Sequence, residues 1–67
     1  MAIMKTIEIM GESKKSWEDA VQNVIDAASD SVDDVKSVWL KDQTAVVKDG
    51  KLDNYRVNCK VTFKVNK

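Results

Sequence analysis

The sequence predicts an α+β domain in which a three-stranded antiparallel sheet packs on a single helix. Three observations predict this fold: one stretch of apolar residues at helical spacing, three stretches with period-2 alternation, and an Asp-Gly pair between the last two stretches. The predicted order is β-α-β-β. At 67 residues, the chain is the size of one small domain, residues 1–67.

The first strand is predicted over residues 2–10. Ile3, Ile7 and Ile9 share one side of a period-2 pattern there, which is typical of a strand with one buried face. We expect the strand to end at Gly11, since glycine often marks a turn.

The helix is predicted over residues 17–30. Ser16 followed three residues later by Asp19 resembles a capping box, and Glu18 and Asp19 suit the positive end of the helix dipole. The predicted apolar stripe consists of Trp17, Ala20, Val21, Val24, Ile25 and Ala28.

The second and third strands are predicted over residues 35–47, with a bend near Asp42–Gln43, and over residues 53–65. The Asp49-Gly50 pair predicts a tight hairpin between them. The third strand alternates strongly, and its expected core face carries Tyr55, Val57, Cys59, Val61, Phe63 and Val65. We expect Trp17 to be a core residue too, and Cys59 to be a buried, inert thiol.

One helix covers only one face of such a sheet. The other face is expected to carry Ser37, Trp39, Lys41, Gln43, Arg56, Asn58 and Lys60. A chain this short buries little surface alone, so we expect a homo-oligomer. Residues 1–34 carry 3 basic and 8 acidic groups, whereas residues 35–67 carry 8 basic and 3 acidic groups. These charges either complement each other within one chain or fix which surfaces of two subunits meet.

Composition argues against several function classes. No apolar run is long enough to span a membrane, and no signal peptide is visible, so we expect a cytoplasmic protein. The chain has one Cys and no His, which excludes the usual zinc sites and His-based triads. The net charge of zero argues against nucleic acid as a partner. No nucleophile–base pair is visible, so we expect no enzyme.

Several motifs together resemble the dodecin family. They are Gly11-Glu12-Ser13, the run Ser16-Trp17-Glu18-Asp19-Ala20, the run Ser31-Val32-Asp33-Asp34-Val35, and the ending from Asp49-Gly50-Lys51 to Phe63-Lys64. The Ser-Trp-Glu and Ser-Val-Asp-Asp runs are most similar to calcium dodecins. The resemblance implies a hollow homododecameric shell. It also implies a non-enzymatic storage protein that holds flavins, riboflavin or FMN, in pairs at subunit interfaces.

In flavin-binding dodecins a second-strand Trp stacks on the flavin and a third-strand Gln bonds its polar edge. The resemblance places Ser37 and Arg56 at these two positions, while Trp39 lies two residues along on the same strand face. The candidate ligand-binding residues are therefore Trp39, Arg56, Ser37 and Gln43. Trp39 is either a stacking platform or a subunit-interface anchor. Arg56 either contacts the ligand or pairs with an acidic helix residue of a neighbouring subunit, and Gln43 either bonds the ligand or faces solvent.

Asp30, Asp33 and Asp34 form the one carboxylate cluster of the sequence. Calcium prefers several oxygen ligands, and a symmetry axis multiplies one carboxylate, so Asp33 and Asp34 are candidate ligands for calcium or another divalent cation. The alternative is a solvated turn. Two functions thus stay open: flavin storage, and a calcium-dodecin-like shell that binds cations at symmetry axes and no flavin.

Overall fold

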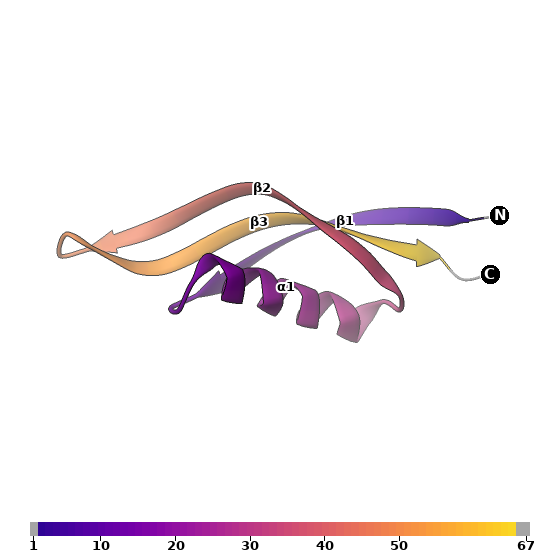
Figure 1. Cartoon of the computed structure of the whole chain (residues 1–67), viewed down its shortest axis with the longest axis horizontal. Helices are drawn as coiled ribbons and strands as arrows, with labels where there is room; N and C mark the ends of the chain where they lie inside the picture. The colour runs from indigo at the N-terminus through magenta and orange to yellow at the C-terminus, as the bar shows by residue number, and fades with distance from the viewer. Residues whose placement is uncertain (1, 66–67) are drawn as a thin grey trace.

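The computed structural model describes residues 2–65 and has its elements in the predicted order (Figure 1). Strand β1 (Ile3–Ser13) is followed by helix α1 (Trp17–Ser31), strand β2 (Val35–Lys48) and strand β3 (Lys51–Val65). The fold prediction is confirmed: one antiparallel three-stranded sheet packs on one helix.

Strand β3 lies in the middle of the sheet, between β1 and β2. The β2–β3 hairpin closes at Asp49 and Gly50, whose φ angles of 53° and 76° are those of a type I′ turn. Pairing with β1 stops where Ser13 meets Tyr55, so the tip of the hairpin continues as a two-stranded arm beyond the helix (Figure 1).

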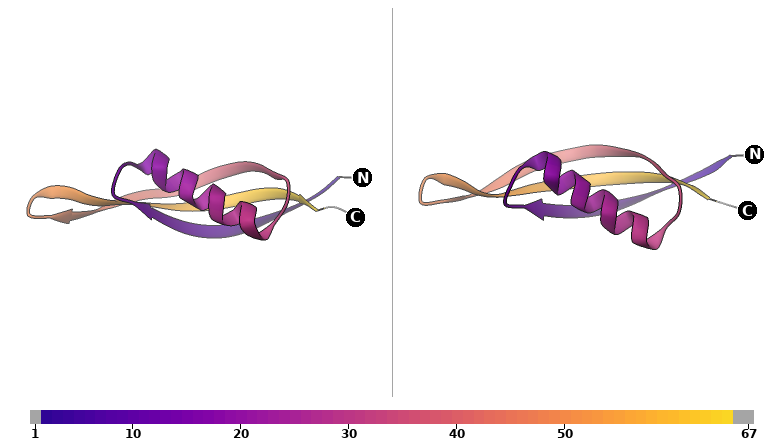
Figure 2. Two further views of the ribbon diagram at one scale, coloured as in Figure 1. Left: turned by 90° about the horizontal axis from the view of Figure 1, so that it is seen from below. Right: turned by 60° about the horizontal axis from the view of Figure 1, so that its bottom comes forward.

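The core lies between α1 and the sheet face that it covers (Figure 2). Ala20, Val24 and Ala28 of the helix are buried against Val57, Cys59 and Val61 of β3. The alternation predicted for β3 is therefore confirmed at its centre, and the central strand supplies half of this core.

Three predicted core aromatics lie at the margin of the core instead. Trp17, Tyr55 and Phe63 are only half-buried. The Trp17 ring meets the Tyr55 ring edge-on, with centroids 4.8 Å apart, and Trp17 Nε1 donates to the carbonyl of Thr44 at 2.9 Å. Trp17 therefore ties the start of α1 to β2 and β3, and its polar nitrogen explains why it stays at the edge.

Strand β1 does not end at Gly11, so that boundary was wrong. Gly11 pairs with Val57, and the strand continues to Ser13. A Cβ atom on Gly11 would lie 2.5 Å from Val24 Cγ2 and 3.0 Å from the carbonyl oxygen of Ala20. The glycine is therefore required by close helix–strand packing and not by a turn.

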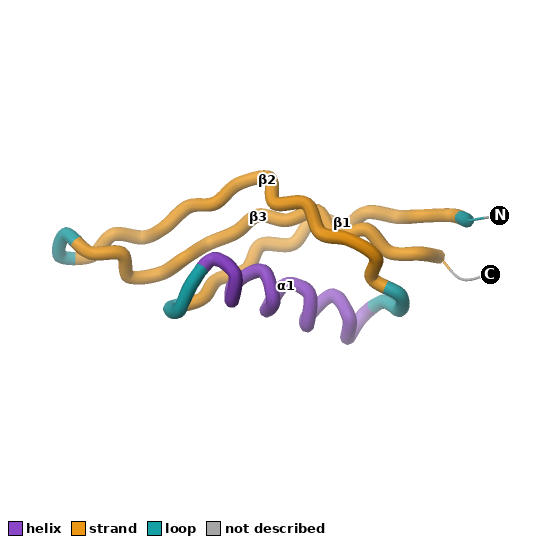
Figure 3. The backbone as a smooth tube through the Cα atoms, viewed as in Figure 1, coloured by secondary structure: helices purple, strands orange, loops and turns teal. Residues whose placement is uncertain are grey.

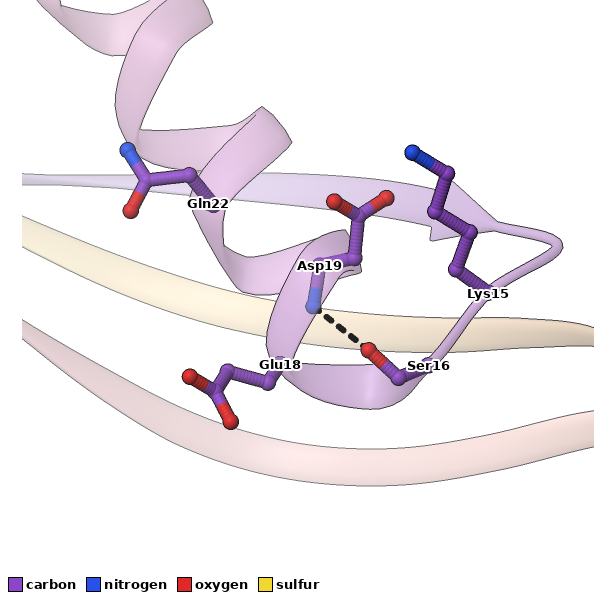
Figure 4. Close-up of a pocket in the computed structure, with 5 residues that line it drawn as sticks. All are labelled: Lys15, Ser16, Glu18, Asp19 and Gln22. Atoms are coloured by element: carbon purple, nitrogen blue, oxygen red, sulfur yellow. Dashed lines mark hydrogen bonds between the residues drawn. The ribbon is translucent and has the colours of Figure 1, made fainter.

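The start of α1 is capped as predicted, with one difference. Ser16 Oγ accepts a hydrogen bond from the Asp19 backbone N–H at 3.0 Å (Figure 4). The Asp19 carboxylate accepts from Ser13 Oγ at 2.6 Å, and Ser13 Oγ in turn accepts from the Lys15 N–H. Asp19 thus links the helix to the end of β1.

The path of strand β2 is irregular (Figure 3), and shifts in its register against β3 change which way its residues face. Leu40 pairs with Cys59 and Gln43 pairs with Val57. Between these two pairs, β2 advances by three residues but β3 by only two. The extra residue at this bulge inverts the alternation beyond Leu40. Gln43 therefore lies at a helix-side register position, and its predicted place on the same face as Trp39 was wrong. Asp42, paired with Asn58, takes that place.

Candidate functional site

The sheet face turned away from α1 is the candidate site, and we call it the open face. No element of the described chain covers it (Figures 1 and 2). The register places these residues, among others, on it: Thr6, Glu8, Met10, Glu12, Ser37, Trp39, Asp42, Thr44, Asn54, Arg56, Asn58, Lys60 and Thr62.

Trp39 is the largest side chain that this face exposes. Its relative exposure is 60%, and the ammonium of Lys60 lies 5.3 Å from the ring centroid. Lys60 pairs in register with Trp39 on one side and with Glu8 on the other. The indole thus carries a cation beside it, in a geometry that stabilises both groups.

Glu8 connects all three strands. Its Oε2 accepts a hydrogen bond from Asn58 Nδ2 at 3.1 Å and from Lys41 Nζ at 3.3 Å. The Asn58 hydrogen bond, followed by the Lys41 ammonium, lowers the pKa of Glu8 below its usual range. Asn58 Oδ1 is buried and has no hydrogen-bond partner among residues 2–65.

Glu12 forms a second network four residues along β1. Its Oε1 accepts from Arg56 Nε and its Oε2 from Asn54 Nδ2, the latter at 3.1 Å. The hydrogen bond from Arg56, followed by that from Asn54, lowers the pKa of Glu12. Arg56 thus has an acidic partner within its own chain, Glu12 on the neighbouring strand, whereas the expected alternative was an acidic helix residue of a neighbouring subunit.

The structure does not bring the candidate ligand residues together in one chain. Trp39 pairs with Lys60 and Arg56 with Thr44, so four residues of β3, or about 13 Å, separate the two. Ser37 pairs with Thr62 and lies about 20 Å from Arg56 on the same basis. Gln43 is exposed but lies at a helix-side position.

The candidate metal ligands Asp33 and Asp34 follow the end of α1. Asp34 has a positive φ of 60°, and its carboxylate pairs with Lys36 Nζ at 2.9 Å. Asp33 is exposed and lines a surface depression with Lys5 and Lys64. Within residues 2–65, no three acidic, His or Cys side chains gather as a metal site would need.

Two further surface features belong to the scaffold. The depression in Figure 4 is lined by Lys15, Ser16, Glu18, Asp19 and Gln22, and it surrounds the helix cap. A second depression lies between the last turns of α1 and the start of β2, with Ile25, Val35 and Val38 in its lining.

Cys59 is fully buried, as predicted. Burial raises the pKa of its thiol, so the reactive thiolate is disfavoured. The helix of the described chain is neither long nor apolar enough to cross a membrane.

Comparison with known proteins decides the family. The family model described as Dodecin matches residues 3–66. The chain belongs to the dodecin family. This confirms the resemblance seen in the sequence, and the family is one of binding and storage proteins.

One relative of this dodecin is a calcium dodecin. Calcium dodecin of Mycobacterium tuberculosis is 35% identical over 65 residues, covering 97% of this chain and 92% of that protein. Its crystal structure, described as having a calcium-binding site, matches with a TM-score of 0.82 at 34% identity, covering 96% and 91% of the two chains.

Two other dodecin structures match with higher TM-scores. A mutant of the T. thermophilus dodecin gives 0.94 at 19% identity, with both chains fully covered. The dodecin from Streptomyces davaonensis gives 0.92 at 21% identity, covering 98% and 97% of the two chains. At this identity these two matches establish the fold.

Sequence reasoning missed Glu8 and Glu12 as members of this face. The signal was present for Glu8, which alternates with Ile7 and Ile9, but Glu12 lay beyond the predicted end of the strand at Gly11. Their partners were not visible, because cross-strand neighbours depend on the register of β1 against β3.

Proposed function

We propose that this dodecin is a non-enzymatic storage protein that forms a homododecameric shell and holds a flavin, riboflavin or FMN, or a similar planar ligand on its open face. Trp39 would stack on the ring, and Arg56 would contact the ligand's polar edge or phosphate.

The exposed indole of Trp39 is the observation that carries this proposal. It stands 60% exposed on a largely polar face, where Met10 is also exposed and which no element of the described chain covers. An indole in that position contributes little to the core, and its exposure beside Met10 favours a role in contacting a ligand or a second subunit.

The separation of Trp39 from Arg56 gives a reason for the shell. A single chain offers one aromatic platform and places its Arg about 13 Å further along β3. A second copy facing the first would add a second indole and a second guanidinium. A ring enclosed between two subunits would be shielded from water and its excited state quenched.

A titration tests the proposal. Riboflavin and FMN are titrated with purified protein while flavin fluorescence is followed, and the particle is weighed by native mass spectrometry. We expect saturable, stoichiometric quenching and a particle of twelve 7.5-kDa subunits. Trp39→Ala should abolish quenching, whereas Met10→Ala, at an exposed position on the same face, should retain it.

Two results would contradict this proposal. Quenching by wild type that survives in Trp39→Ala would remove the stacking role. A particle that dissociates in Trp39→Ala, with wild-type protein that never quenches flavin, would make Trp39 an interface anchor.

Calcium binding is the second candidate function. The 35% identity to a calcium dodecin favours it, together with the exposed position of Asp33 after α1. A single chain gathers too few carboxylates within residues 2–65, so the site would form where copies meet at a symmetry axis.

Melting temperatures with CaCl2 or with EDTA test this second candidate. Calcium should raise the melting temperature of the wild type and have no effect in Asp33→Asn or Asp34→Asn. Asp26→Asn, on the exposed side of α1, is the matched control and should keep the calcium effect. An equal shift in all four proteins would show general screening by salt.

A further inference from the structure

Glu12 is the residue that fixes how Arg56 is held. The two are register partners on adjacent strands, so they lie directly opposite each other on the open face. The carboxylate Oε1 receives the Nε–H of Arg56, and Oε2 receives an N–H of Asn54 at 3.1 Å. Asn54 is two residues before Arg56 on β3 and faces the same side.

The position of this bond on the guanidinium is informative. Glu12 engages Nε, and no hydrogen bond within residues 2–65 reaches either terminal Nη group. The guanidinium is planar and rigid, so a bond at Nε sets the direction of its Nη groups. The Arg56 side chain is 47% exposed, which leaves those groups open to the surface.

Glu12 is itself held in place. Its second oxygen accepts a hydrogen bond from Asn54, and its carboxylate is ionised at neutral pH because its pKa, already acidic, is lowered further by Arg56 and Asn54. It therefore remains an acceptor for Nε under physiological conditions, and the network Asn54–Glu12–Arg56 is a chain of charge-assisted bonds.

We propose that Glu12 is a positioning residue for Arg56: it holds the guanidinium through Nε, so that the two terminal Nη groups face outward as a preorganised donor pair for an oxygen-bearing ligand group. This inference rests on the proposed function, because Arg56 is there the residue that contacts the ligand's carbonyl edge or phosphate. Glu12 touches no ligand in this scheme and acts only by orienting Arg56.

The chain contains a matched control for Glu12. Glu8 lies four residues earlier on the same strand face and likewise accepts from one Asn and one cation, Asn58 and Lys41. Glu8 has no contact with Arg56, so removing it disturbs the face comparably without releasing that guanidinium.

Flavin dissociation constants of the assembled protein test the assignment. FMN and riboflavin are each titrated against wild type, Glu12→Ala, Glu12→Gln, Glu8→Ala, Arg56→Ala and the double variant Glu12→Ala/Arg56→Ala. Native mass and circular dichroism verify that each variant is assembled and folded. If Glu12→Ala disturbs the assembly, Asn54→Ala replaces it, because it loosens Glu12 without touching Arg56.

We expect Glu12→Ala to weaken binding about five- to tenfold, which is less than the roughly 10- to 150-fold loss of a charged hydrogen bond, because Arg56 itself remains. Glu12→Gln should retain most of the affinity, because its amide oxygen still accepts from Nε. The double variant should bind no more weakly than Arg56→Ala, because Glu12 acts through Arg56. A loss for FMN alone would place the Nη groups on the phosphate, and a loss for both flavins would place them on the ring carbonyls.

Other outcomes would overturn the assignment. Unchanged or tighter binding in both Glu12 variants would make the carboxylate irrelevant or a competitor for Arg56. An equal loss in Glu8→Ala would mean a general effect of charge on the face. Wild-type protein that binds neither flavin would overturn the proposed function and this inference with it. The outcomes above overturn only the role of Glu12, because in them the wild type still binds flavin.

Discussion

The two faces of the sheet use the same three strands for opposite purposes. On the side of α1, Val57, Cys59 and Val61 are buried against Ala20, Val24 and Ala28. On the open face, many of the alternate residues are charged or amide side chains, and six of the side chains there form two networks, one around Glu8 and one around Glu12.

The difference shows which face stabilises the fold. Removing apolar area from water is the main source of stability, and nearly all of the fully buried apolar area in the described chain lies on the helix side. The ion pairs of the open face are solvent-exposed, and such pairs add little stability. With Trp39 and Met10 also exposed there, the open face is suited to binding a partner or ligand.

The difference between the two faces is tested most directly by introducing an Asp at one or the other of two adjacent residues of β3, one on each face. Val61→Asp buries an unpaired carboxylate in the core and should cost about 4 kcal/mol or more. A domain of this length has only about 3–10 kcal/mol of stability, so we expect loss of the folded state. Circular dichroism and native mass spectrometry measure it.

Thr62→Asp is the control for that change, since Thr62 faces the opposite side and bonds Thr6 at 3.2 Å. Thr62→Asp should remain folded under the conditions in which the wild type is folded. If Thr62→Asp were as damaging as Val61→Asp, the open face would contribute to folding as much as the core does.

A smaller effect is expected at Gly11, where α1 and β1 are in closest contact. Gly11→Ala places a methyl group against Val24 and the carbonyl of Ala20, and such overpacking should cost about 1–3 kcal/mol. Urea unfolding at fixed protein concentration measures the change. Met10→Ala, at the preceding residue and on the open face, should shift the midpoint of urea unfolding little. An equal shift in Gly11→Ala and Met10→Ala would contradict the packing argument.

The smallest effect on stability is expected from lowering the pH. The pKa values of Glu8 and Glu12 are lowered in the folded chain, relative to about 4.3 in an unfolded one. Their contribution to stability is therefore full above that value and is lost as the pH falls through the lowered pKa values. Melting temperatures between neutral and acid pH should fall less steeply in Glu8→Gln/Glu12→Gln than in wild type. Parallel slopes would show that neither network is linked to folding.

Much of this fold could be predicted from local pattern. The helical stripe from Trp17 to Ala28, the alternation around Cys59 and the Asp49-Gly50 turn each follow from rules that act over a few residues. The predictions failed where distant segments meet. Gly11 was taken for a turn because its close contact with Val24 is invisible in sequence.

The candidate site was less predictable than the fold. Gln43 was placed beside Trp39 by strict alternation, and one bulge between Leu40 and Asp42 moved it to the other side. The partners of Arg56 also could not be found, because they depend on the pairing of β1 with β3, which brings Glu12 opposite Arg56.

The sequence by itself determined the identity and order of the elements, the face that becomes the core and the family. These depend on periodicity and turn chemistry, which are local properties of the chain. Only the tertiary structure decided the central place of β3, the separation of Trp39 from Arg56 and the Glu8 and Glu12 networks. Strand register sets all three, and register is fixed by how helix and strands pack together across the whole domain.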